Sequence, residues 1–69
     1  MAHFEGVSTR ELMVVLANAT AARAERLGIA LAVAAENTLC SARQDFGIPE
    51  ERLPSRSELT LMASALAQA

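Results

Sequence analysis

The side chains able to carry out chemistry are few in this chain and far apart in its sequence. One histidine, His3, and one cysteine, Cys40, occur among 69 residues, and lysine, tyrosine and tryptophan are absent. Residues near a terminus are usually exposed and weakly held, which is our interpretation of His3. A free cysteine is commonly a small buried apolar group, which is our interpretation of Cys40. Glu36, followed by Asn37 and Thr38, is best explained as part of a solvated helix face. We therefore predict no catalytic residue, and a protein that is not an enzyme.

Metal and cofactor sites are not indicated either. A structural zinc ion needs about four protein ligands, and the only soft ligands are the single histidine and the single cysteine. Gly6, Gly28 and Gly47 are scattered, so they do not form a phosphate-binding loop. The sequence thus predicts no metal ligand, no cofactor and no cofactor-binding residue.

The composition is apolar for so short a chain. Hydrophobic residues make up 52% of it, charged residues 20%, and the mean hydropathy is +0.25. A domain of this size buries only about 60% of the surface of its unfolded chain, and such domains often need a disulfide, a metal or a second subunit. One cysteine excludes a disulfide within the chain. We therefore predict that the protein pairs with itself.

Two serine–glutamate pairs mark helix starts. In a capping box, the serine hydroxyl accepts from the amide of a glutamate three residues later, and the glutamate carboxylate accepts from the serine amide. Ser8 and Glu11 match this pattern, as do Ser55 and Glu58. Val7 and Leu12 occupy the two positions of a hydrophobic staple around this first helix start. The sequence predicts helices beginning at Ser8 and Ser55.

The course of the chain at Gly28 is open to three interpretations. A glycine after basic residues is typical of a helix end, yet no turn residues follow it. The chain could form one long helix, two helices meeting at a sharp bend, or a strand at 29–33. Alanines alternate with the apolar residues of 29–33, so we favour helix. A continuous helix over 8–46 would be roughly 57 Å long. The helix at 55–69 could not cover it, and a second chain would be required.

The second helix end is sharper, because Gly47, Ile48 and Pro49 follow Phe46. Glycine ends the helix, the apolar residue packs back on the last turn, and proline forbids continuation. Residues 49–53 are expected to form a single turn. The predicted organisation is one domain, 1–69, with an arm at 1–7, a helical region at 8–46 with a break at 28 left open, a connector at 47–54 and a helix at 55–69.

These elements predict an all-α fold, with a long helix, straight or bent, a shorter C-terminal helix, and pairing into a helical homodimer. Residues 12–17 are apolar on every side, as in a helix buried by more than one neighbour. Apolar residues left over after the core is filled would bind other proteins. The candidate protein-interface residues are Leu12, Val15, Leu16, Ala19, Leu31, Leu39, Phe46, Leu59, Met62 and Leu66.

The expected compartment is the cytoplasm. The apolar stretches 12–22 and 27–35 are shorter than the roughly 20 residues of a membrane span. Glu5 and Glu11 do not fit the positively charged start of a signal peptide. We expect no contact with a membrane.

A DNA-binding regulator is the alternative function. Residues 47–69 could form a turn followed by a recognition helix, with Arg52 and Arg56 contacting DNA. Three glutamates in the same segment and a net charge of −2 count against this reading, because DNA-binding surfaces are basic. Nucleic acid is therefore the less favoured partner.

The chain resembles two known families of proteins. The run AARAERLGIALAVA, residues 21–34, resembles the helix-to-strand opening of haem-binding HbpS/GlcG-like proteins, although the Asp-x-x-Gly turn expected after that strand is absent. The size, the Ala-rich composition with arginine as its only base, and the two capped helical segments resemble the small phage-encoded quorum-sensing anti-activators of Pseudomonas phages. That resemblance implies a non-enzymatic inhibitor, dimeric and helical, acting in the host cytoplasm. It would bind a LuxR-type quorum-sensing transcription regulator and block its DNA binding, with the type IV pilus assembly ATPase as another host partner.

Overall fold

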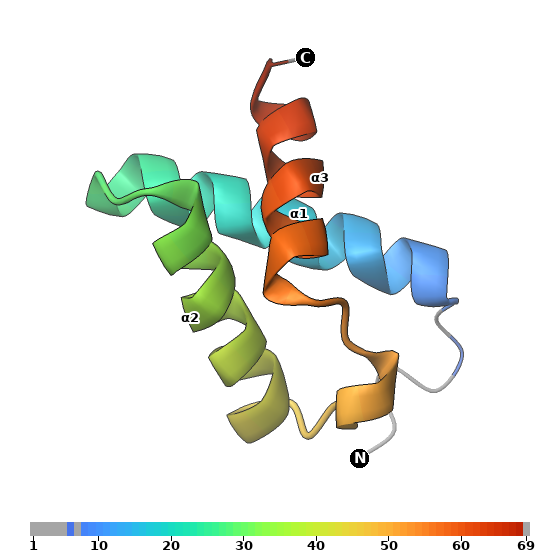
Figure 1. The fold of residues 1–69 in the computed structure, drawn as a ribbon. Helices are drawn as coiled ribbons and strands as arrows, with labels where there is room; N and C mark the ends of the chain where they lie inside the picture. Colours follow the sequence, from blue (N-terminus) through green and yellow to red (C-terminus); the bar gives the residue numbers. More distant parts are fainter. Residues whose placement is uncertain (1–5, 7, 69) are drawn as a thin grey trace.

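Capping boxes begin the first and last helices of the computed structural model (Figure 1). Ser8 Oγ accepts a hydrogen bond from the Glu11 amide at 3.1 Å, and Glu11 Oε1 accepts one from the Ser8 amide at 3.1 Å. Ser55 and Glu58 repeat both bonds, also at 3.1 Å. Each box satisfies two backbone amides that have no partner inside the helix. Both predicted helix starts are confirmed; Val7, the predicted staple residue, lies outside the described residues.

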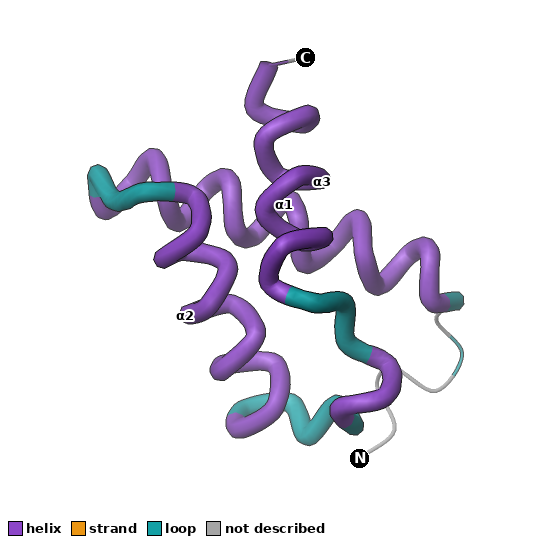
Figure 2. Tube along the Cα trace, viewed as in Figure 1, coloured by secondary structure: helices purple, strands orange, loops and turns teal. Residues whose placement is uncertain are grey.

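The structure describes Gly6 and residues 8–68, and every regular element in that part of the chain is helical (Figure 2). The predicted all-α fold class is confirmed. The single turn expected in the connector is the 3-10 helix η1. Apart from Gly6, the arm predicted at 1–7 lies outside the described residues. The elements are α1 (Thr9–Leu27), α2 (Leu31–Gln44), η1 (Glu50–Arg52) and α3 (Arg56–Gln68).

The helical region predicted at 8–46 is divided at Gly28. This glycine has a φ of 67° and a ψ of 35°, in the left-handed region. The Ala24 carbonyl accepts from the amide of Gly28 and, at 3.1 Å, from the amide of Ile29. Glycine in this conformation ends a helix and satisfies its last carbonyls. Helix α2 begins at Leu31, so the chain forms two helices that meet at a bend.

The structure contains neither a strand at 29–33 nor one continuous helix over 8–46. Residues 31–33 form the first turn of α2 rather than a strand, in keeping with the helix preference of their alanine. The longest axis of the Cα trace is 32 Å, which excludes a continuous helix of roughly 57 Å over 8–46. A second chain is therefore not needed to cover a long helix, because α1 packs against both α2 and α3 of its own chain.

The end of α2 follows the predicted glycine–proline pattern with a small shift. The helix ends at Gln44, two residues before Phe46. Gly47 has a φ of 65°, and the Ile48 amide donates to the Ala42 carbonyl at 3.1 Å. This bond turns the chain back so that Ile48 enters the core. Phe46 is left just beyond the helix, at the surface.

All three α-helices contribute to one apolar core, with α1 crossing behind α2 and α3 in Figure 1. Several buried core residues are alanines, and their short side chains let the helices approach closely. Partly buried Leu53, Met62 and Leu66 pack against this core. The core cluster consists of Leu12, Leu16 and Ala17 of α1, Ala35, Leu39 and Ala42 of α2, Ile48, and Leu59 of α3.

A buried pair of threonines joins α1 to α2. Thr20 Oγ1 lies 2.9 Å from Thr38 Oγ1, and each hydroxyl also lies within hydrogen-bond distance of a carbonyl four residues earlier: Leu16 O at 2.8 Å and Ala34 O at 2.9 Å. The two hydroxyl protons are shared among these three contacts, and each proton has an acceptor oxygen within hydrogen-bond distance. Among the described residues, no buried side-chain polar atom lacks a partner.

None of the helices in the described part of the chain combines the length and the apolar character needed to cross a membrane.

Candidate protein-binding groove

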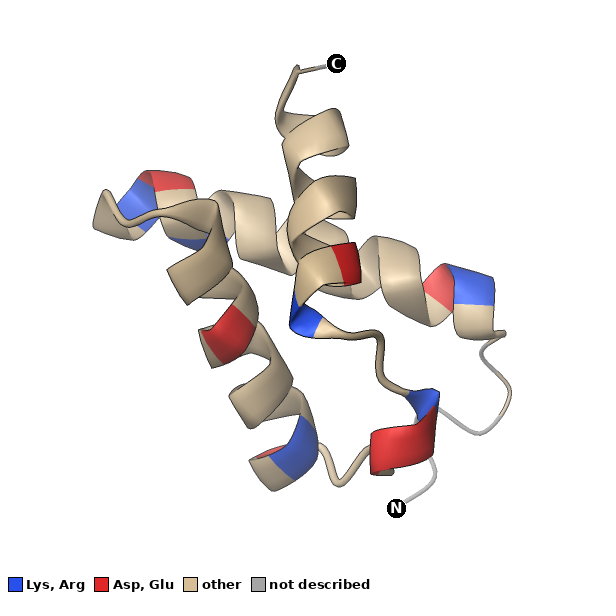
Figure 3. Cartoon of the chain, viewed as in Figure 1, with Lys and Arg blue, Asp and Glu red and all other residues tan. Residues whose placement is uncertain are grey.

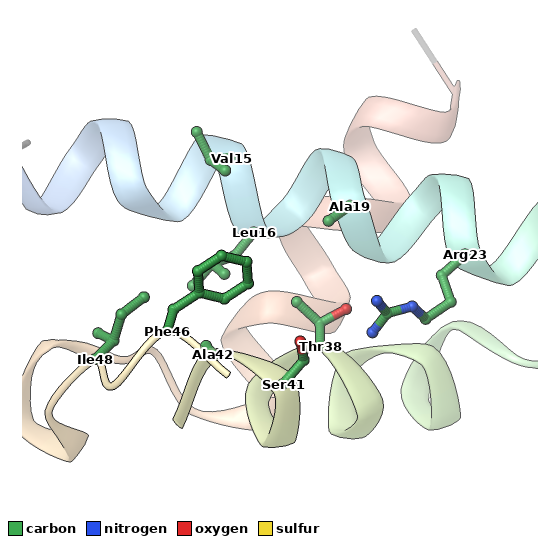
Figure 4. Close-up of a pocket in the computed structure, with 9 residues that line it drawn as sticks. All are labelled: Val15, Leu16, Ala19, Arg23, Thr38, Ser41, Ala42, Phe46 and Ile48. Carbon is green, nitrogen blue, oxygen red and sulfur yellow. The ribbon is translucent and has the colours of Figure 1, made fainter. Parts of the chain in front are cut away.

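A groove of about 290 Å³ runs between α1 and α2 (Figure 4). Its α1 side is formed by every fourth residue of the helix, Val15, Ala19 and Arg23, which places them on one stripe. Phe46 and Ile48 close the end nearest Val15. The remaining lining residues are Leu16, Thr38, Ser41 and Ala42.

The groove is an apolar surface laid directly over the core. Leu16 and Ile48 form its floor and are core residues, 7% and 5% exposed. Val15 and Phe46 rise from its edge and are 53% and 59% exposed. Large apolar side chains exposed next to one another mark interaction sites more often than plain surface. This groove is therefore the strongest candidate site in the described part of the chain.

The apolar surface continues along α1 beyond the groove. A shallower hollow is lined by Arg10, Glu11, Val14 and Val15, and it shares Val15 with the groove. Val14 is itself exposed. Of the apolar run 12–17, two adjacent valines thus remain at the surface after the chain's own core is complete.

The groove hydroxyls are already engaged within the chain. The Thr38 hydroxyl belongs to the buried threonine pair. Ser41 Oγ donates to Asp45 Oδ2 at 3.0 Å. Neither hydroxyl therefore depends on a ligand for its hydrogen bonds.

Arg23 is the charged residue of the groove. Its side chain is half-buried, and Figure 4 shows the guanidinium directed along the groove toward Thr38 and Ser41. Among the described residues, no carboxylate lines the groove. The ion pair between Arg43 and Glu50, at 3.4 Å, lies outside it, and Arg23 has no ion-pair partner in the described part of the chain.

The structure separates the predicted interface residues into three groups. Leu12, Leu16, Leu39 and Leu59 are core residues, so their side chains are occupied within the chain. Val15, Ala19 and Phe46 lie together at the groove, with Leu16 beneath them. Leu31 and Leu66 line a separate, wider hollow near the bend, and Met62 packs on the core.

Sequence reasoning missed Arg23 and the α2 side of the groove. The signal for Arg23 was its spacing, since it lies one helical turn beyond Ala19 and two beyond Val15. The α2 side combines Thr38, Ser41 and Ala42, whose mixed character gives no comparable signal.

The residues that could carry out chemistry are not brought together in the described part of the chain. Cys40 is half-buried in α2, and His3 lies outside the described residues. No group of three or more His, Cys, Asp or Glu residues there could hold a metal ion.

The segment considered for DNA binding is mostly uncharged or acidic. Arg56 and Glu58 lie in the first turn of α3, and the rest of that helix carries no charge (Figure 3). Arg52 shares η1 with Glu50 and Glu51. The connection between α2 and α3 spans residues 45–55, longer than the three- or four-residue turn of a helix-turn-helix motif.

Comparison of the chain with protein-family models, curated proteins and solved structures finds no match.

Proposed function

We propose that the protein is a non-enzymatic inhibitor that binds a regulatory protein of a host cell through the groove between α1 and α2. One observation carries the proposal: Val15 and Phe46 stand more than half exposed over an apolar floor. Grooves of this kind bind an amphipathic helix of another protein by its apolar face.

A protein segment fits the groove better than a small molecule does. Small-molecule sites bury about 70–90% of the ligand and hold several convergent polar groups. This groove is open at Val15 and Phe46, and its hydroxyls are bonded within the chain. Its surface is thus suited to contact along one face of a partner.

The proposed target is a LuxR-type quorum-sensing transcription regulator, whose DNA binding the inhibitor would block in the host cytoplasm. The type IV pilus assembly ATPase is a further proposed partner. Both follow from the resemblance to the phage anti-activators, and the apolar groove supports the binding role they share.

Self-pairing is also proposed, on the apolar surplus of the chain rather than on a long uncovered helix. With the helical region bent at Gly28, the support comes from apolar side chains that remain exposed. They are Val14, Val15, Leu27, Val33, Phe46 and Leu61. Light scattering at micromolar concentration tests this proposal: twice the chain mass supports the dimer, and the mass of one chain contradicts it.

The inhibitor role is tested with a purified LuxR-type regulator from Pseudomonas and its operator DNA in a gel-shift assay. We expect the wild-type protein to abolish the shifted band. The double variant Val15→Ser, Phe46→Ser should not abolish it. The matched control is Leu61→Ser, which removes an exposed leucine of α3 that does not line the groove.

The possible outcomes distinguish a wrong target from a wrong binding surface. No effect of the wild type on the band contradicts this target. Equal inhibition by the wild type and the groove variant contradicts the groove.

DNA binding as the protein's own function receives less support, because α3 carries Arg56 as its only cation. Binding to duplex DNA at low salt that is lost on Arg52→Ala with Arg56→Ala would favour it over the inhibitor.

A further inference from the structure

We infer that the segment occupying the groove is an amphipathic helix of a partner protein carrying a carboxylate that pairs with Arg23. This inference rests on the proposed function, because it specifies the chemistry of the segment bound there.

The shape of the groove suits one side of a helix. Val15 and Arg23 are eight residues apart on α1, which places them roughly 12 Å apart along the axis, a little over two helical turns. The small side chain of Ala19 lies midway between them, and Ala42 lines the groove from α2. A groove with small residues at its middle lets another helix approach closely.

The charge of the groove determines what else that helix must carry. Arg23 is the only charged residue among the described residues that line the groove, and its guanidinium is directed along it (Figure 4). The hydroxyl protons of Thr38 and Ser41 are used by Ala34 O and Asp45 Oδ2. A guanidinium has five donors in a planar fork that matches a carboxylate. A helix that covered Arg23 without supplying a carboxylate would remove a cation from water uncompensated.

The position of the acid follows from the same geometry. The largest apolar contact lies at the end of the groove beside Val15 and Phe46, and the cation lies toward the other end. We therefore expect an aspartate or glutamate one to two helical turns from the partner's main apolar residue.

Two other occupants are outcomes of the test. Among the described acids, a second copy of this chain would have to use Glu25, Glu36 or Glu51, because Glu11 and Glu58 are held in capping boxes, Glu50 pairs with Arg43 and Asp45 accepts from Ser41. A fatty acid would supply the carboxylate, but the exposed edge at Val15 would leave much of its chain in water.

A displayed peptide library provides the test. A library of amphipathic helices is displayed on yeast, with apolar residues at i, i+3, i+4 and i+7 and with the other positions randomised. The folded full-length protein is the bait. Selection on the wild type should enrich Asp or Glu at one position, one to two turns from the largest apolar residue. Selection on Arg23→Gln, which keeps the length of the side chain, should lose that enrichment.

One enriched peptide is then measured by fluorescence anisotropy against its glutamine twin. Replacing the peptide acid, or Arg23 by Gln, should weaken binding about two- to fivefold. Making both replacements should weaken it no further. Arg23→Glu with a lysine in the peptide should restore part of the affinity, which a purely structural role of Arg23 would not produce. Circular dichroism of each variant checks that it is folded.

The outcomes distinguish this inference from the proposed function. Peptides that depend on Val15 and Phe46 but ignore Arg23→Gln overturn the acid pairing and leave the groove as the docking surface. Peptides insensitive to all three positions, or a library without binders, overturn both the helical occupant and the groove. Displacement of the peptide by laurate at equal affinity, or protection of the groove by self-association, overturns the partner helix.

Discussion

Two adjacent stripes of α1 have opposite roles. Leu12, Leu16, Thr20 and Ala24 recur every fourth residue and are buried in the chain's own fold. The stripe shifted by one residue, Val15, Ala19 and Arg23, faces the groove. A rotation of about 100° per residue separates the two stripes, so one helix completes the core and presents a binding surface. The comparison predicts that substitutions in the core change the free energy of unfolding, whereas substitutions on the groove stripe change binding.

The largest expected effect is on the core side, at Leu59 of α3. This side chain is 0% exposed in the cluster that contains Leu12. Leu59→Ala should lower the free energy of unfolding by about 2–5 kcal/mol, because it removes buried surface and leaves a cavity. Urea unfolding followed by circular dichroism measures the change. Leu61→Ala, at a leucine of the same helix that is 72% exposed, should change it by less than about 0.5 kcal/mol. Equal losses in the two variants would contradict the assigned core.

The bend at Gly28 ranks next, because it decides whether α2 can form the second side of the groove. A Cβ at this position would meet no atom within 4 Å, so the effect of a substitution comes from the positive φ. Gly28→Ala should lower the free energy of unfolding by about 1–2 kcal/mol. Gly28→Asn should cost less, because asparagine tolerates the left-handed conformation. Both are measured by urea unfolding, with light scattering alongside. A gain in stability, or an elongated dimer formed by Gly28→Ala, would contradict the bend.

Local sequence signals predicted the ends of helices better than the bend between them. The hydroxyls of Ser8 and Ser55 act within three residues, so their capping boxes are readable from spacing alone. At Gly28 the following Ile29 and Ala30 have the composition of a helix, although they form the loop. The chain bends there because α1 and α2 bury apolar surface against each other, and that gain is not visible in a short window of sequence.

Only part of the candidate site was predicted from the sequence, because a pattern of apolar residues does not show what covers them. Val15, Ala19 and Phe46 were all among the predicted interface residues and line one groove, but helical spacing relates only Val15 to Ala19. The same spacing also selected Leu12 and Leu59, which are core residues. Periodicity identifies an apolar stripe, but it does not say whether the same chain or another one covers it.

The buried pair Thr20 and Thr38 tests how firmly α1 is attached to α2. Thr38→Val should lower the free energy of unfolding by about 0.5–1 kcal/mol, since the Thr20 hydroxyl retains the Leu16 carbonyl as an acceptor. Thr20→Val should behave alike, because Thr38 retains the Ala34 carbonyl. A double-mutant cycle by urea unfolding measures their coupling, with the double variant expected to lose less than the sum. Strict additivity would show that the hydroxyl–hydroxyl contact contributes nothing.

The smallest effect on stability is expected on the groove stripe itself, at Val15. The side chain is 53% exposed, so Val15→Ser removes little buried surface and should change the free energy of unfolding by less than about 0.5 kcal/mol. Its effect on binding of a helical peptide selected on the groove should be larger than its effect on folding, because the residue becomes buried only in the complex. Anisotropy and urea unfolding on the same sample measure the two quantities. Leu16→Ala, one residue along, should show the reverse order, with stability lost first because Leu16 is only 7% exposed. If both substitutions act mainly on stability, the two stripes share one structural role and α1 has no separate binding face.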